Sequence, residues 1–412
     1  MTGADMRERA RRAIAECRLL ALMTEEPGRI TRRFLTLPTH DVHAHLRARM
    51  EELGMHVRVD AVGNLRGLWR PEGATGKRIL IGSHIDTVPD AGAFDGVLGV
   101  TLALEWVGIA QELGLRMPIE VIAFSEEEGV RYGLPYLGSR AVAGSFDASL
   151  LALTDAEGVS VEAALRGFGL DPARIGEAAV GDDALCFIEV HIEQGPLLEA
   201  EELSVAAVTA IVGQTRLTLT FTGHANHAGT APMHLRRDAL AAAAEWIAAV
   251  EAHGRNTEGL AATVGRVSVE PNVGNVVPGV VRVSLDVRHA EDSVRIAAVK
   301  NLLEQADAIA SRRGLELACA GQLEQAAVPM DERLRAMMSA AIEAAGYPAK
   351  AMPSGAGHDA ILMAARLPTA MLFVRSPGGV SHHPAEDVRE EDVKASLHVA
   401  REFLQQLSLD VG

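Results

Sequence analysis

The sequence predicts an α/β fold with a mixed, mostly parallel sheet and an inserted ferredoxin-like α+β unit. The first observation is a β-α-β order, in which apolar strands at 78–82 and 119–125 flank a helix at 96–113. The second is that Ala-rich helical stretches, such as the one at 239–250, alternate along the chain with short Val/Ile runs. Before the first strand, two amphipathic helices are expected within residues 5–56, around a loop that contains Pro27-Gly28 and Pro38.

The middle of the chain predicts the inserted unit. Residues 214–221 alternate with period two, as in a half-exposed strand, and a helix is expected at 238–253. Two further strands at 261–269 and 280–287 and a helix at 293–313 complete a β-α-β-β-α-β order. We therefore predict a main domain formed by 1–211 and 326–412, with an inserted domain at 212–325.

Composition excludes several classes of protein. Of 412 residues, 48% are hydrophobic and 23% charged, which is typical of a folded protein of two or three domains. The net charge of −16 argues against binding to nucleic acid or anionic membranes. Three widely separated cysteines predict no disulfide framework and suit a reducing cytosol. The N-terminus lacks an apolar signal segment and no run is long enough to span a bilayer, so we expect a cytoplasmic protein.

Five short polar segments at expected strand ends or loops carry the chemistry. They are Gly82-Ser-His84-Ile-Asp86-Thr, Phe94-Asp95-Gly96, Ser125-Glu-Glu-Glu-Gly129, Glu189-Val-His191-Ile-Glu-Gln194-Gly and Ser381-His-His-Pro-Ala-Glu386. Together they supply imidazoles and carboxylates in a set that fits two divalent ions sharing one carboxylate. The sequence has neither a Gly-x-Ser-x-Gly nucleophile elbow nor a Gly-rich phosphate loop of the usual spacing.

Each segment also has a structural interpretation. His84 either ligates a metal, with the Asp86 carboxylate on the far imidazole nitrogen, or bonds within a turn. Asp95 either bridges two cations or caps the helix that follows it. The acids at 126–128 either form a solvated face, or one of them binds a cation while another accepts a proton. His191 and the two histidines before Pro384 have polar-turn alternatives of the same kind.

The ordered set of segments resembles the di-metal aminoacylase/carboxypeptidase superfamily over nearly the whole chain. His191-Ile-Glu-Gln-Gly195, Asn226-His-Ala-Gly-Thr230 and Pro353-Ser-Gly-Ala-Gly-His-Asp359 are similar to the branch of allantoate amidohydrolases and N-carbamoyl-L-amino-acid hydrolases. The resemblance implies a catalytic domain with two metal ions per subunit, Mn²⁺, Zn²⁺ or Co²⁺. It also implies that the inserted domain serves as a dimerisation and lid domain in a homodimer.

The resemblance assigns roles residue by residue. It implies one metal on His84, Asp95 and His191, and a second on Asp95, Glu128 and His382. Glu126 or Glu127 could replace Glu128, and His383 could replace His382, but the family places the ligands directly before the Gly and directly after the Ser. Glu127 is then the general base and Asp86 supports the catalytic site.

The substrate contacts are implied in the same way. His227 would stabilise the oxyanion from the partner subunit, and Arg288 would bind a substrate carboxylate through two parallel hydrogen bonds. Further substrate contacts are expected from Gln194, Gln214, Asn275, Gly357 and His358. Without the resemblance, Arg288 paired with Asp286 or Glu291 and Asn275 in a turn are the simpler interpretations. His224 departs from the Glu that many relatives have, which adds a titratable group beside Asn226.

The predicted substrate is a ureido-carboxylate. Three segments resemble the allantoate subgroup most closely, which implies allantoate as substrate with ureidoglycine, ammonia and CO₂ as products: Asp60-Ala-Val-Gly-Asn64, Pro353 to Asp359 and Arg375 to Pro384. The alternative is an N-carbamoyl-L-amino-acid hydrolase, or more remotely a β-ureidopropionase. A non-catalytic binding member of the fold would have lost a ligand or Glu127, and every expected position is filled.

Overall fold

The computed structural model describes residues 3–74 and 76–410. The chain divides into two compact units. Unit 1 comprises the chain up to Thr209, Met330–Met352 and the chain from Ala356 on, and unit 2 comprises Ala210–Pro329 and Pro353–Gly355. The predicted motif Pro353 to Asp359 is therefore divided between the two units. In the described part of the chain, no helix is long and apolar enough to cross a membrane.

Unit 1 is built on a mixed sheet with the order β1-β2-β4-β3-β5-β16-β6-β14, and β15 pairs with β6. The central strands β4, β3, β5 and β16 pair with one another in parallel, whereas the β1–β2, β2–β4, β16–β6 and β6–β14 pairs are antiparallel. The strands are β1 His56–Val59, β2 Leu65–Trp69, β3 Arg78–His84, β4 Ile119–Phe124, β5 Ala184–Ile192, β6 Val205–Ile211, β14 Val328–Pro329, β15 Ala351–Ser354 and β16 Thr369–Val374. The mixed α/β class is confirmed, with the parallel part at the centre of the sheet.

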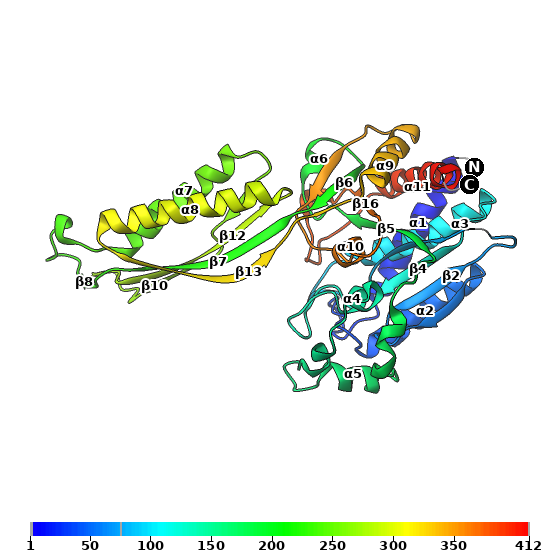
Figure 1. The fold of residues 1–412 in the computed structure, drawn as a ribbon, viewed down its shortest axis with the longest axis horizontal. Helices are drawn as coiled ribbons and strands as arrows, with labels where there is room; N and C mark the ends of the chain where they lie inside the picture. The colour runs from blue at the N-terminus through cyan, green and yellow to red at the C-terminus, as the bar shows by residue number, and fades with distance from the viewer. Residues whose placement is uncertain (1–2, 75, 411–412) are drawn as a thin grey trace. The chain divides into compact units, whose positions relative to one another are not determined.

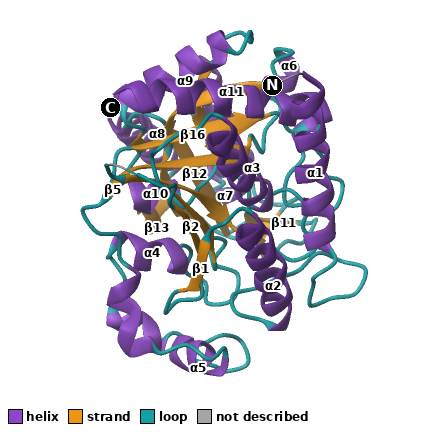
Figure 2. Cartoon of the chain, turned by 90° about the vertical axis from the view of Figure 1, so that its right-hand side faces the viewer, coloured by secondary structure: helices purple, strands orange, loops and turns teal. Residues whose placement is uncertain are grey.

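The helices of unit 1 bury the sheet. They are α1 Gly3–Ala21, α2 Leu37–Glu52, α3 Val97–Glu112, α4 Leu137–Ala143, α5 Val161–Gly167, α6 Leu197–Ala200, α9 Glu332–Ala344, α10 Ala360–Ala364 and α11 Glu390–Asp410. Helix α3 packs on β3 and β5 and contacts α1 and α11 (Figure 2). A Cβ at its Gly99 would lie 2.1 Å from the carbonyl oxygen of Val190, so only glycine permits this close approach.

One prediction for this part of the chain is wrong. Pro38 was expected in the loop between the first two helices, but it lies in the first turn of α2. Proline is well suited to this position because the first N–H groups of a helix have no intrahelical partner.

Unit 2 has a five-stranded antiparallel sheet in the order β10-β12-β7-β13, with β9 also paired to β12. Helices α7 and α8 lie along one face (Figure 1) and bury Trp246, Phe221 and Leu302 against it. Its elements are β7 Gly213–Thr222, α7 Ala239–Asn256, β9 Ala261–Thr263, β10 Val267–Glu270, β12 Val280–His289, α8 Asp292–Arg313 and β13 Glu316–Gln325. This strand order is that of a ferredoxin-like fold. A two-stranded ribbon joins β8 Asn226–His227 to β11 Val276–Val277.

The strand expected at 261–269 is interrupted. Thr263 pairs with Asp286 and Val267 with Val283, so four steps along one strand correspond to three along the other. One residue is therefore inserted between β9 and β10, which is the definition of a β-bulge. Ser284 fills the gap by accepting a hydrogen bond from the Arg266 backbone N–H at 2.9 Å.

Candidate metal centre

The predicted metal ligands converge at the carboxyl ends of the parallel strands. His84 ends β3, His191 lies in β5, and the loops after β4 and β16 carry Glu128 and His382. Asp95 precedes α3. Such strand ends are where open α/β sheets bind ligands, because all the parallel strands terminate at one edge. All five residues belong to unit 1.

The ligand atoms form overlapping groups. In each group the atoms lie within 4.8 Å of one another, and the groups are His84-Asp95-His191, His84-Glu127-Glu128 and Asp95-Glu128-His382. Asp95 is common to two of them. Its Oδ1 lies 3.1 Å from His191 Nε2 and 3.7 Å from His84 Nε2, and its Oδ2 lies 3.1 Å from His382 Nε2. One carboxylate therefore faces two sets of imidazoles with its two oxygens.

Backbone carbonyls select the histidine tautomers. Nδ1 of His84 lies 3.0 Å from the carbonyl oxygen of Asp86, and Nδ1 of His191 lies 2.9 Å from that of Ile192. Each Nδ1 donates its proton there, so the neutral imidazole presents a lone pair on Nε2. In both rings this nitrogen lies near Asp95 Oδ1, another acceptor, and on His191 it also accepts the backbone N–H of Gly96 at 3.2 Å. Oδ1 is buried and has no hydrogen-bond partner among the described residues.

Facing lone pairs require a proton or a cation between them. Hydrogen bonding to Asp95 raises the pKa of His382 to about 9, although burial opposes it. Burial, together with the charge of Asp95, raises the pKa of Glu128 to about 7. Protons and divalent cations therefore compete for the same atoms. The nitrogen and oxygen donors and the orphaned Oδ1 fit a pair of Mn²⁺, Zn²⁺ or Co²⁺ ions.

The three acids of the 126–128 run point to different places. Glu126 is turned away, and its Oε2 accepts the N–H of Leu137 at 3.4 Å. Glu128 Oε1 lies 3.6 Å from His382 Nε2. Glu127 groups with His84 and Glu128, and burial raises its pKa well above the usual range. This arrangement favours Glu128 as the ligand and Glu127 as the adjacent base.

The two adjacent histidines are distinguished in the same way. His382 has a backbone φ of 55°, in the left-handed region, and its ring faces Asp95. His383 instead accepts the N–H of Ala385 on its Nδ1 at 3.1 Å, which caps a turn. Gln194 and Tyr136 also have positive φ, at 58° and 73°. Such strained residues cluster at functional sites.

The predicted role of Asp86 needs a correction. Its carboxylate was expected on the far nitrogen of His84, but the Asp86 main-chain carbonyl takes that position. The carboxylate accepts the backbone N–H groups of Glu127 at 2.9 Å and Glu128 at 3.1 Å, and its Oδ1 stays 3.4 Å from His84 Nδ1. Asp86 thus orients the acid loop in addition to the imidazole.

Comparison with known proteins identifies the family and supports the fold. Residues 80–406 match the sequence profile of peptidase family M20/M25/M40. The chain belongs to this family. It is therefore a hydrolase acting on C–N bonds, in a metal-dependent family.

Relatives and solved structures of this family cover most of the chain. It is 38% identical to an N-carbamoyl-L-amino acid amidohydrolase of Geobacillus stearothermophilus, over 92% of this chain and 94% of the relative. It is 34% identical to an allantoate amidohydrolase of Bacillus subtilis (strain 168), over 92% and 93%. The crystal structure of an amidase of the hydantoinase/carbamoylase family from Burkholderia multivorans aligns with a TM-score of 0.90 at 33% identity, covering 96% of this chain and 97% of that one.

The predicted substrate residues of this M20 family member are divided between its units. Gln194 lies at the metal centre, where its Nε2 is 3.0 Å from Asp95 Oδ2 and 3.4 Å from His382 Nε2. His358 is buried, with its ring centroid 4.4 Å from that of His191. A Cβ at Gly357 would lie 2.0 Å from Tyr136 Oη, so glycine makes room for that phenol. Gln214, His227, Asn275 and Arg288 all belong to unit 2.

Glu386, at the end of the Ser381–Glu386 segment, connects two loops of the metal centre. Its Oε1 accepts the backbone N–H groups of Phe94 and Asp95 at 2.9 and 3.0 Å, and its Oε2 accepts the hydroxyl of Ser381 at 3.1 Å. It therefore ties the loop of Asp95 to the loop of His382. Its position three residues after His383 suggested a place near the metal centre. The sequence does not show, however, which backbone N–H groups a carboxylate will accept.

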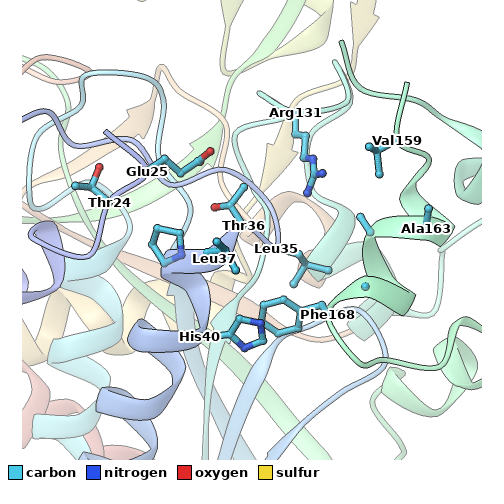
Figure 3. Close-up of a pocket in the computed structure, with 13 residues that line it drawn as sticks. Thr24, Glu25, Leu35, Thr36, Leu37, His40, Arg131, Val159, Ala163 and Phe168 are labelled. Carbon is cyan, nitrogen blue, oxygen red and sulfur yellow. The ribbon is translucent and has the colours of Figure 1, made fainter. Parts of the chain in front are cut away.

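A cavity of about 650 Å³ in unit 1 contains none of the predicted site residues. In Figure 3, His40 stacks on Phe168, and Arg131 points into the space from the far side. The two rings are 3.9 Å apart at an interplanar angle of 6°. Nε of Arg131 is 2.9 Å from Asp155, so its charge is already compensated. The cavity volume alone would have pointed away from the metal centre.

Proposed function

We propose that the protein is an amidohydrolase of a ureido-carboxylate, with allantoate as the first candidate substrate. The observation that carries this proposal is the Asp95 carboxylate between two imidazole groups, with Glu127 beside them. Curated relatives named allantoate amidohydrolase and N-carbamoyl-L-amino acid amidohydrolase support the ureido class. We further propose a cytoplasmic location, which suits three free cysteines.

We assign one ion to His84, Asp95 and His191 and another to Asp95, Glu128 and His382. Bound divalent cations supply Lewis acidity, which polarises the ureido carbonyl and makes water a stronger acid. Glu127 takes the proton of the attacking water and returns it to the leaving nitrogen. Burial raises the pKa of Glu127, which makes its carboxylate a better proton acceptor than an exposed one.

His227 is the proposed oxyanion donor. Its Nδ1 accepts the backbone N–H of Gly229 at 3.0 Å, so the neutral ring carries its proton on Nε2. The residue is exposed on β8, which leaves Nε2–H available to a substrate oxygen. Arg288 would bind the substrate carboxylate, and Gln194, Gln214, Asn275, Gly357 and His358 would contact its other polar groups.

We propose that the protein is a homodimer through unit 2. Strand β13 is one edge of its sheet, with β9 and β10 at the other, and eight of its ten residues are exposed. Around Cys319 this edge is Ala318-Cys-Ala-Gly321, without the Lys or Pro that usually prevents edge pairing. A second copy could therefore extend the sheet, which would let His227 act in the partner's site.

Mixing two inactive variants tests the action of His227 across the dimer. E127Q and H227A homodimers are each expected to be inactive, whereas a hybrid dimer contains one site with both wild-type residues. Random exchange should therefore restore about one quarter of wild-type activity. Absence of any recovery, with hybrids verified by differently tagged chains, would show that His227 acts within its own subunit or not at all. A mass of twice 43.7 kDa in light scattering is the accompanying requirement.

A substrate panel tests the choice of substrate. Protein loaded with Mn²⁺, Zn²⁺ or Co²⁺ is offered allantoate, N-carbamoyl-L-amino acids and N-carbamoyl-β-alanine, and ammonia release is measured. We expect the highest kcat/KM with allantoate. Turnover of carbamoyl amino acids alone would replace allantoate by the alternative substrate. No turnover of any of them, with both ions bound, would favour a non-catalytic binding protein.

A further inference from the structure

In unit 2, the carboxylate of Asp286 receives hydrogen bonds from three side chains. Gln214 Nε2 and Arg216 Nε donate to its Oδ2 at 2.8 and 3.0 Å. Arg288 donates from Nε to Oδ1 at 2.9 Å and from Nη2 to Oδ2 at 3.0 Å. The network follows from strand register, because Asp286 of β12 pairs with Arg216 of β7, and Arg288 pairs with Gln214. Residues two apart on a strand project from the same face.

These bonds leave a defined part of Arg288 unused. A guanidinium has five N–H groups, and two of them point at Asp286. A third, on Nη1, donates to the carbonyl oxygen of Gly355 at 2.8 Å. One N–H remains on each of Nη1 and Nη2, and a carboxylate accepts such a pair through its two oxygens. Arg216 uses only Nε toward Asp286, so its terminal nitrogens can also reach a ligand.

The same residues line a cavity of about 640 Å³, a volume typical of small-molecule sites. Three arginines, Arg216, Arg266 and Arg288, contribute to its wall, and among the described residues that line it Asp286 is the single acid. The lining therefore carries a formal surplus of positive charge. Burial opposes ionisation of Asp286, but its bonds to Arg288, Arg216 and Gln214 keep its pKa below the usual value. The network is thus charged at neutral pH.

We infer that Asp286 is a positioning residue that holds Arg288 and Arg216 as a preformed receptor for the carboxylate of the substrate. The inference rests on the proposed function, since it requires a substrate with a carboxylate, and it adds Asp286 and Arg216 to the binding machinery. Without Asp286, Arg216 would be free to rotate and Arg288 would keep only its bond to Gly355, so both side chains would lose more conformational entropy on binding the ligand. Asp286 removes part of that cost before the substrate arrives.

The test compares Asp286→Asn with wild type on two matched probes. These are the substrate found by the panel, allantoate or an N-carbamoyl-L-amino acid, and the corresponding carboxamide. D286N keeps the shape of the side chain but removes its charge. We expect KM for the carboxylate to rise roughly 10- to 100-fold, with kcat nearly unchanged. KM for the neutral carboxamide should not change, since it never used the receptor.

Two further variants make the result specific. Arg288→Ala should show the same loss of preference for the carboxylate, and D286N/R288A should be no worse than R288A alone. Arg282→Gln is the control. Arg282 lies on β12 four residues before Asp286, but its guanidinium pairs with Glu270 and not with Asp286. It should leave KM, kcat and the carboxylate preference unchanged.

The outcomes separate the two proposals. If R288A raises KM for the carboxylate but D286N does not, Asp286 is not a positioning residue and the proposed function stands. If D286N raises KM equally for the carboxylate and for the carboxamide, Asp286 has a structural role and the inference is overturned. If R288A leaves KM unchanged, the proposed carboxylate contact is wrong, and the receptor with it. Should D286N fail to fold, Arg216→Gln at a half-exposed position must raise KM for the carboxylate alone.

Discussion

Glu127→Gln should reduce kcat by about 1,000-fold or more, in the upper range for loss of a general base, while the protein still binds its metal ions. The amide has nearly the shape of the carboxylate but cannot accept the proton of the attacking water. Because Glu127 is not in the Asp95-Glu128-His382 group or the His84-Asp95-His191 group, neither proposed ion depends on it. The measurement is kcat together with metal content by elemental analysis. Unchanged turnover with both ions bound would exclude Glu127 as the base.

Glu126→Gln is the matched control for that experiment. The side chain is one residue away and also buried, but it turns toward the backbone of Leu137. Since a glutamine oxygen can accept the same N–H, we expect kcat within about tenfold of wild type. A larger loss in E126Q than in E127Q would exchange the roles that the geometry favours for these two acids.

Asp95→Asn should abolish binding of one ion and weaken the other, with activity reduced by about 1,000-fold or more. A carboxylate offers an oxygen to each set of imidazoles, whereas an amide offers one oxygen and no charge. Wild type should be stabilised by about 2.7 kcal/mol when the free metal concentration is 100 times its Kd. D95N should lose most of this stabilisation. Calorimetric metal titration and the thermal midpoint with and without chelator measure both effects.

The control for D95N is Asp90→Asn, the same substitution five residues earlier. Asp90 has a φ of 55°, which Asn also tolerates, and its carboxylate forms a long ion pair with the exposed Arg29, whereas its backbone N–H donates to Thr31 in any variant. D90N should therefore bind two ions with wild-type affinity. If D95N also bound two ions as tightly as wild type, Asp95 would not be the bridging ligand.

Local patterns predicted most of the regular elements. The apolar runs that became β3 and β4 and the alternating run that became β7 were located to within a few residues, because burial of a face leaves a periodic trace. The interruption between β9 and β10 left no such trace. It depends on the pairing of Thr263 and Val267 with β12, and a single sequence does not show its partner strand.

Neighbouring residues of the same type were harder to separate. Glu126, Glu127 and Glu128 are chemically alike, and His382 and His383 are adjacent, so the residues alone left their roles open and only the family resemblance chose between them. In the structure the choice depends on long-range partners: Leu137 for Glu126, Asp86 for the backbone of Glu127 and Glu128, and Asp95 for His382. The same holds for Glu386 and Asp286, whose partners are distant in the chain.

The sequence by itself determined the α/β class, the family and the set of imidazole and carboxylate groups available for metal binding. These depend on residue identity and local spacing, which the chain order preserves. Only the tertiary structure decided which oxygen of Asp95 faces which histidine, which backbone Asp86 supports and how Asp286 connects Arg216 to Arg288. The physical reason is that directional contacts of a few ångströms depend on strand register and loop conformation, which are set by packing between segments far apart in sequence.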